Sequence, residues 1–294
     1  MDTAGAQDNL QTAIIKMIAF FDLFDYPLTL YEIREHLDRR YGWLEIRAAA
    51  ESAGGTLDQQ NGFYFLTGRA GVVTTRQKRY NYTRRKLKIA RRFSALFRLF
   101  PPVRLIALAN SLGQYNWRDE SDIDFFIVTA PGYLWLTRLY CTGLAKLLHS
   151  RPTPQRKRDK ICLSFYLSAA HLDISDLRLT GDDPYFDYWR RCLIVLYNKR
   201  NTYADFLAAN GLVPDEPAPG VRPVVPAHRR RSGLESWARW WQLKVMPPAL
   251  TAAMNNSDGV VVNDEVLKFY QGDRRREYAE KYGQKIQPLI KAGA

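Results

Sequence analysis

The sequence predicts a mixed α+β protein, and three patterns in its 294 residues support this. Apolar residues recur at helical spacing over residues 9–24, and two shorter helical stretches follow. The dipeptide Asn61-Gly62 lies between short β-prone runs, which is typical of a hairpin. Residues 123–128 are apolar apart from Asp124 and predict a buried strand. We therefore expect a small mixed sheet flanked by helices, with a separate helical module before it.

The first module, residues 1–70, has the layout of a winged helix: three short helices and then a hairpin. A capping-box pattern, Thr29-Leu-Tyr-Glu32, begins the second helix, and the third covers residues 43–53. In a winged helix the third helix can enter the major groove of DNA. The charged residues on this helix are of mixed sign: Glu45, Arg47 and Glu51. DNA binding, dimerisation and packing against the rest of the chain all stay open.

A long basic helix is predicted next, over residues 71–100. The chain carries a net charge of +13, and residues 59–118 contain no Asp or Glu. That stretch holds thirteen basic residues: Arg69, Arg76, Lys78, Arg79, Arg84, Arg85, Lys86, Lys88, Arg91, Arg92, Arg98, Arg104 and Arg118. We expect the helical part, from Arg76 to Arg98, to face RNA or another polyanion. A solvated helix face is the alternative.

Two aspartates at the start of the predicted buried strand are the strongest chemical signal. Asp122 and Asp124 are two residues apart, so their side chains point to the same side of the strand. Neighbouring carboxylates repel each other, and a divalent cation that prefers oxygen ligands relieves the repulsion. Mg²⁺ fits best, with Mn²⁺ as the alternative. A second short strand, residues 104–109, precedes them and ends at Asn110-Ser111.

This spacing resembles the signature of the polymerase-β-type nucleotidyltransferase superfamily. In that family a strand ends in a Gly-Ser turn, about ten residues follow, and the next strand carries Asp-x-Asp. The resemblance implies a nucleotidyltransferase fold over residues 101–213. It also implies that Asp122 and Asp124 are catalytic metal ligands, and that the turn holds the triphosphate of an NTP. The turn residues are Asn110, Ser111 and Gly113.

The wider chain also resembles a group of uncharacterised bacterial nucleotidyltransferase-domain proteins. The shared segments are Phe24-Asp-Tyr-Pro-Leu-Thr29, Ser121-Asp-Ile-Asp124, Ile161-Cys-Leu163 and Leu267-Lys-Phe269. Two departures stand out. Asn110 replaces the turn glycine. The expected third carboxylate is missing from the strand at residues 161–167, where Ser164 stands in its place. Asp159 and Asp173 are the nearest acidic residues outside that strand.

These features predict a metal-dependent nucleotidyltransferase that moves an NMP from an NTP to a hydroxyl of an acceptor, with RNA such as tRNA as the first choice. Arg118 and Lys160 are candidates for neutralising further phosphate charge. One alternative is a catalytically degenerate protein that binds nucleic acid or regulates. Another is an AMPylating partner in a toxin–antitoxin pair. The absence of a GxxxxGK[ST] loop argues against the common ATP-binding folds.

The rest of the chain adds context. Residues 214–232 are rich in Pro and Arg and predict a linker, and residues 233–294 predict a helical region. Helices are expected at 185–197, 234–245, 264–270 and 273–290, and a short strand at 260–262. The three cysteines are scattered, no signal peptide is apparent, and no apolar run is long enough for a membrane span. We expect a cytoplasmic protein whose oligomeric state stays open.

Overall fold

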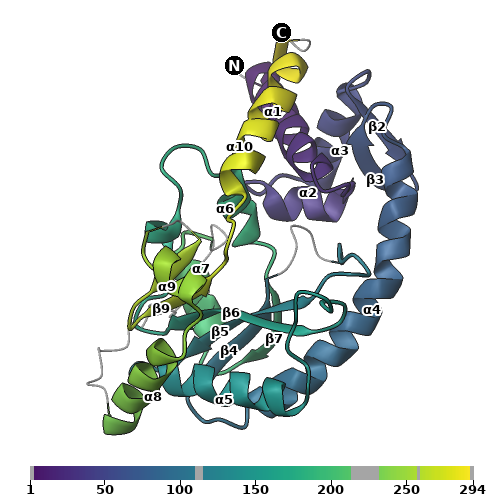
Figure 1. Ribbon diagram of the computed structural model, residues 1–294. Helices are drawn as coiled ribbons and strands as arrows, with labels where there is room; N and C mark the ends of the chain where they lie inside the picture. Colours follow the sequence, from purple (N-terminus) through teal and green to yellow (C-terminus); the bar gives the residue numbers. More distant parts are fainter. Residues whose placement is uncertain (1–2, 110–114, 213–231, 257–258, 292–294) are drawn as a thin grey trace.

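A computed structural model of the chain describes residues 3–109, 115–212, 232–256 and 259–291 (Figure 1). The fold is mixed α+β, as predicted: a six-stranded mixed sheet is flanked by helices, and a small three-stranded sheet accompanies the first helices. The two ends of the described chain lie close together, where α1 (Thr3–Asp22) and α10 (Arg275–Lys291) run side by side (Figure 1). None of the described helices has the length and apolar character of a membrane span.

The N-terminal elements match the predicted winged-helix-like layout. After α1 come α2 (Leu30–His36) and α3 (Trp43–Ser52), and then a hairpin. The hairpin strands are β2 (Leu57–Gln60) and β3 (Phe63–Leu66), and β1 (Leu28–Thr29) pairs with β3 to complete an antiparallel sheet. The predicted capping box is present, because the Thr29 hydroxyl accepts a hydrogen bond from the Glu32 amide and the Glu32 carboxylate accepts one from the Thr29 amide.

The long basic helix is α4 (Gly71–Phe97), which runs along one side of the molecule from the small sheet to the large one (Figure 1). The cations of α4 and of its C-cap, Arg98, are buried, partly buried or exposed, and the partly buried one, Arg85, forms ion pairs with Asp119 and Asp159. Arg76, Arg79 and Lys86 are buried and serve the fold; Arg76, for example, forms an ion pair of 2.7 Å with Glu32. The exposed group is Lys78, Arg84, Lys88, Arg91, Arg92 and Arg98. The expectation that the whole stretch faces a polyanion is therefore wrong for the three buried residues.

The large sheet has the strand order β7-β4-β5-β6-β9-β8. Its strands are β4 (Val103–Leu108), β5 (Ile123–Thr129), β6 (Ile161–Ser168), β7 (Ile194–Asn198), β8 (Val260–Val262) and β9 (Val266–Phe269). Only β5 and β6 are parallel among these neighbours, and all other pairs are antiparallel. The strand with the aspartates thus lies in the middle of the sheet.

Side chains alternate between the two faces of this sheet and fill two separate cores. On β5, Phe126 and Val128 face a core shared with α1, α2 and α3, whereas Phe125 and Ile127 face a core shared with α4 and α5 (Leu134–Leu147). The remaining helices are a short 3₁₀ turn (Ser175–Leu177), α6 (Pro184–Trp189), α7 (Thr202–Ala209), α8 (Gly233–Lys244) and α9 (Pro248–Ala253). Asp124 has the parity of Phe126, so it points toward the face that α6 covers.

Two expected helices are wrong in whole or part. The helix expected at 185–197 ends at Trp189, and the chain then forms β7 on the edge of the sheet beside β4. The helix expected at 264–270 is β9, which pairs with β6 and β8. Residues 194–198 and 266–269 are apolar apart from Asn198 and Lys268, and pairing with β4 in the first case, and with β6 and β8 in the second, selects the extended form. The C-terminal region is thus partly strand, and the predicted linker lies almost wholly outside the described residues.

Candidate metal centre and substrate cavity

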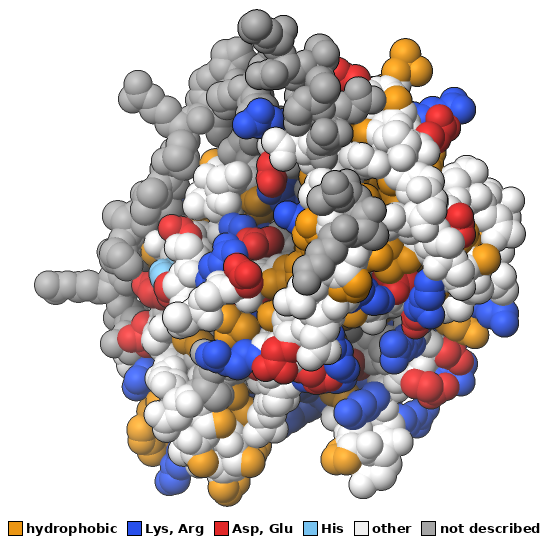
Figure 2. All heavy atoms as spheres, turned by 90° about the horizontal axis from the view of Figure 1, so that it is seen from above, with side chains coloured by type: hydrophobic (Ala, Val, Ile, Leu, Met, Phe, Trp, Pro, Cys, Tyr) orange, Lys and Arg blue, Asp and Glu red, His pale blue; other side chains and the backbone are white. Residues whose placement is uncertain are grey.

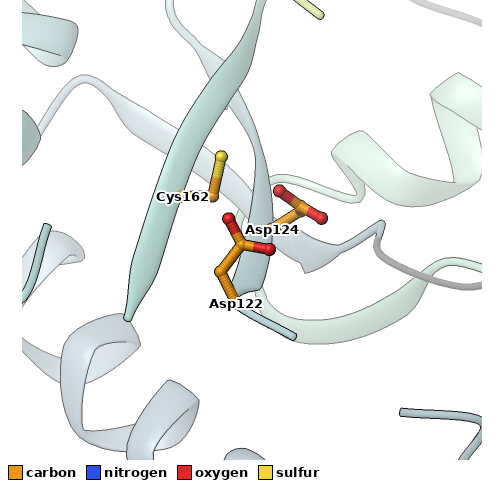
Figure 3. Close-up of side chains that lie close together, drawn as sticks. All are labelled: Asp122, Asp124 and Cys162. Atoms are coloured by element: carbon orange, nitrogen blue, oxygen red, sulfur yellow. The ribbon is translucent and has the colours of Figure 1, made fainter. Parts of the chain in front are cut away.

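The two aspartates are held at the start of β5 by backbone hydrogen bonds on both sides. The Ile123 amide donates to the Lys160 carbonyl at 2.8 Å, and the Ala109 amide donates to the Asp124 carbonyl at 3.1 Å. Asp122 immediately precedes the strand and Asp124 is its second residue. Figure 3 shows the two carboxylates on the same side of the strand, as the spacing predicts.

The loop that delivers Asp122 is fixed by Lys86 of α4, which sequence reasoning had placed on a polyanion surface. Its ammonium group is buried and donates to the carbonyls of Asp119, at 3.1 Å, and Ser121. It also forms a 3.0 Å ion pair with Asp159. Burial lowers the pKa of Lys86. Lys86 thus anchors the loop at Ser121, the residue immediately before Asp122.

The third side chain beside the pair is a thiol. Cys162 of β6 lies opposite Asp124 in the strand register, and one ligand atom from each of Asp122, Asp124 and Cys162 lies within 4.8 Å of the others (Figure 3). Among the described residues, neither predicted acidic candidate joins this group. Asp159 is occupied by Lys86 and Arg85, and Asp173 accepts a hydrogen bond from the Ser175 amide.

A β-bulge aims the thiol at the carboxylates. Between Asp124 and Phe126 on β5 the partner strand advances from Cys162 to Phe165, so β6 has one extra residue there. The thiol lies 3.5 Å from the hydroxyl oxygen of Ser164. Burial and the charges of Asp124 and Asp122 raise the pKa of Cys162. Ser164 therefore stands where the third carboxylate was sought, and it contacts the thiol that occupies the position beside the pair.

The donor set fits a divalent cation. Two carboxylates are suitable ligands for Mg²⁺ and Mn²⁺, which prefer oxygen donors. A sulfur donor suits borderline and soft ions such as Zn²⁺ and suits Mg²⁺ poorly. The site thus combines the oxygen pair expected for a magnesium centre with a third ligand that shifts the preference toward thiophilic ions.

A cavity of about 230 Å³ opens next to the aspartate pair. Asp124 forms part of its wall together with Ala109, the last described residue before the predicted phosphate-binding turn. Six aromatic side chains also line it: Phe165, Tyr185, Phe186, Trp189, Tyr270 and Tyr278. The Trp189 indole donates to the Ala109 carbonyl at 3.0 Å, so an aromatic wall residue fixes the end of β4. An aromatic cavity beside carboxylates suits a flat ring attached to a charged group.

Charged residues of the C-terminal segment support the other wall of this cavity. Arg275 is buried and donates to Asp183, the N-cap of α6, at 2.8 Å, and it also pairs with Asp273. Lys268 of β9 pairs with Asp273 at 3.3 Å and faces the cavity. Burial, with repulsion from Arg275, lowers the pKa of Lys268 to about 8. The cavity wall therefore carries three cationic residues, Lys268, Arg274 and Arg275, and two of them, Lys268 and Arg275, belong to a connected, buried network with Asp273 and Asp183.

The other predicted site residues have different outcomes. Asn110, Ser111 and Gly113 lie outside the described residues. Lys160 has its backbone next to Ile123, but its ammonium group donates to the His149 carbonyl at 2.7 Å and it does not line the cavity. Arg118 is exposed and lines a second, neighbouring cavity.

Sequence reasoning missed Cys162 and Lys268. In the sequence Cys162 is one of three scattered cysteines, and its place beside the aspartates depends on a strand register that the sequence does not specify. Lys268 lies in the shared segment Leu267-Lys-Phe269, and its place opposite Phe165 follows only once residues 266–269 are a strand. The sequence gives one indication that Cys162 and Lys268 are functional. Each lies in a segment that the chain shares with the nucleotidyltransferase-domain proteins it resembles.

Comparison of the chain with protein-family models, with curated proteins and with solved structures finds no match. The resemblance to nucleotidyltransferases thus depends on the residues described above.

Proposed function

We propose that the protein is a metal-dependent nucleotidyltransferase. One observation carries the proposal: Asp122, Asp124 and Cys162 converge within 4.8 Å at the edge of a cavity that Asp124 itself lines. A divalent cation bound there would offset the negative charge of a triphosphate during attack at the α-phosphorus. Ala109, whose amide donates to the Asp124 carbonyl, is the last described residue before the segment 110–113 to which the resemblance assigns the triphosphate.

The proposed reaction is the transfer of an NMP group. A hydroxyl oxygen of the acceptor forms a bond to the α-phosphorus of an NTP, the bond from that phosphorus to the β-phosphate bridging oxygen breaks, and pyrophosphate leaves. The hydroxyl proton passes to water. In this chain Asp122 and Asp124 would orient the phosphates through the metal, Lys268 would place a positive charge in the cavity, and the aromatic wall would hold a ring by stacking.

A second candidate function has its own observation. The position beside the aspartates holds a thiol instead of a carboxylate, and a missing third carboxylate weakens metal-dependent proton transfer. The thiol in place of a carboxylate therefore also fits a protein that keeps the fold and binds a nucleotide or nucleic acid without catalysing a reaction. RNA, a protein side chain and a small metabolite all stay open as acceptors in the first proposal.

The test is incubation with each α-labelled NTP, with Mg²⁺ or Mn²⁺, and with total RNA or cell lysate. The variant is Asp122→Asn/Asp124→Asn, and the matched control is Asp38→Asn/Asp182→Asn, which removes two exposed carboxylates elsewhere. We expect label transfer by the wild type and the control and at least a 100-fold loss in the variant, a size typical of removing a group that stabilises the transition state. Equal labelling by all three proteins would remove the assignment, and no labelling with any acceptor would favour the binding function.

A further inference from the structure

A second cavity, of about 400 Å³, lies beside the first one. It is bounded by the loop after α1, by α4, by the loop before Asp122 and by the start of α10. Four of its lining residues are cationic and none is acidic. The lining is Leu23, Phe24, Arg79, Asn116, Trp117, Arg118, Ser121, Tyr185, Arg274, Tyr278 and Lys281.

The positive charge of this basic cavity is only partly neutralised by neighbours. Arg79 is nearly buried and bonds the Phe24 carbonyl at 2.8 Å and the Asn116 side-chain oxygen at 2.5 Å, with Asp25 at 3.5 Å as its ion-pair partner. Burial and repulsion from Arg118 lower the pKa of Arg79. The two arginines are therefore close enough to repel each other, which a bound anion would relieve.

The other cationic residues of the basic cavity add to its excess positive charge. Arg274 and Lys281 share a single carboxylate, Glu277, at 2.6 Å each. Arg118 forms no ion pair with any residue in the part of the chain that the structure describes. Four cations thus meet two carboxylates, Asp25 and Glu277, and Asp25 also pairs with Arg69. On the face seen in Figure 2, Lys and Arg side chains lie interspersed with Asp and Glu side chains.

The basic cavity is continuous with the candidate metal site. Ser121, in its wall, immediately precedes Asp122. Tyr185, Arg274 and Tyr278 line both cavities, and the two tyrosine rings stack with centroids 5.5 Å apart and an interplanar angle of 12°. A ligand that lies across this stacked pair would reach the aspartates at one end and the arginines at the other.

We propose that the basic cavity is a binding site for phosphate groups, and that it holds the phosphate of the acceptor while its hydroxyl lies in the first cavity. The assignment of an acceptor rests on the proposed function, whereas phosphate binding by the cavity does not. Arginine guanidinium groups bind phosphate oxygens through paired hydrogen bonds. The hydrogen bonds to Phe24 and Asn116 fix the orientation of the Arg79 guanidinium group. The phosphate belongs to a nucleic-acid strand or to a small phosphorylated molecule.

The test measures binding in EDTA, so that no metal contributes. The probes are tripolyphosphate, by calorimetry, and a fluorescein-labelled eight-nucleotide RNA, by anisotropy. The cavity variant is Arg118→Ala/Lys281→Ala, and both residues are exposed, so the fold tolerates their loss. The matched control is Arg84→Ala/Arg92→Ala, which removes two exposed cations from α4 outside the cavity.

We expect the cavity variant to bind at least one probe about 10-fold more weakly and the control to stay within about 2-fold, because the cavity variant loses charge-assisted contacts with phosphate and the control does not. Loss of RNA binding in the cavity variant identifies a nucleic-acid strand as the source of the phosphate. Loss of tripolyphosphate binding alone identifies a small ligand. Failure of both probes to bind the wild type, or equal binding by the two variants, would overturn the proposal. A protein that binds phosphate here but transfers no label would contradict only the proposed function.

Discussion

Replacing Cys162 by Asp would test directly whether this side chain lies against the aspartate pair. The substitution creates three carboxylates whose oxygens lie within about the 4.8 Å that now separates the ligand atoms. At an effective dielectric constant of about 20, two like charges at that distance repel by about 3.5 kcal/mol, and the variant gains two such pairs. All three side chains are only partly buried, so solvent screening reduces the sum, and we expect a net loss of about 3 kcal/mol.

The assay is thermal unfolding in EDTA and again with saturating Mg²⁺. For a chain of this size, about 1 kcal/mol corresponds to about 2–4 °C, so Cys162→Asp should lower Tm by about 6–12 °C in EDTA. Mg²⁺ should restore most of that loss, because a cation at 100 times its dissociation constant stabilises the folded state by about 2.7 kcal/mol. The wild type, with a thiol in that place, should respond less to Mg²⁺ than to Zn²⁺.

Cys162→Asn is the matched control, since it has the shape of aspartate without the charge. We expect it to lose less stability than Cys162→Asp in EDTA and to gain nothing extra from Mg²⁺. If the Asp and Asn variants unfolded at the same temperature with and without Mg²⁺, the side chain at 162 would not face the two carboxylates, and the three-ligand site would be wrong.

Two other predictions concern the supporting structure. Glu235 of α8 is buried and accepts hydrogen bonds from the Trp135 and Leu136 amides, at 2.7 and 2.9 Å, so it caps the N-terminus of α5. Glu235→Ala should cost about 2–4 kcal/mol in denaturant unfolding, with Glu235→Gln losing less, and an unchanged midpoint would show that this cap contributes nothing. Burial lowers the pKa of His36 to about 4, against the attraction of Glu32, so folded His36 binds its proton less readily than unfolded His36 does. Its contribution to stability, at most about 3 kcal/mol, is therefore complete above about pH 6.5 and is lost as pH falls toward 4, and His36→Gln should flatten stability over that window. A variant with the wild-type pH profile would refute the role of His36.

Much of the fold could be predicted because local patterns decided it. The capping box at Thr29, the dipeptide Asn61-Gly62 and the apolar run of β5 each specify structure within a few residues, and all three elements formed as expected. The segments 193–197 and 266–269 could not be assigned in the same way. Each is a short, mostly apolar run, and its conformation depends on pairing with strands that are distant in the sequence.

The candidate site shows the same division. The relation between Asp122 and Asp124 follows from the two-residue period of a strand, and it was predictable. The position of Cys162 depends on the pairing of β5 with β6 and on one extra residue in β6, which are tertiary features. The role of Lys86 could not be predicted either. In the sequence it is one of thirteen cations in a stretch without acidic residues, and only the structure shows that its ammonium group is buried against the loop before Asp122.

The central claim is that Asp122 and Asp124 bind a divalent cation beneath a nucleotide. Its most direct test is a titration of Mn²⁺ into the protein, followed by the loss of the free Mn²⁺ signal in electron paramagnetic resonance, with and without a nonhydrolysable NTP analogue. We predict one bound Mn²⁺ per chain, bound more tightly with the analogue, and no bound ion in Asp122→Asn/Asp124→Asn. Equal Mn²⁺ binding by the wild type and this variant would contradict the claim.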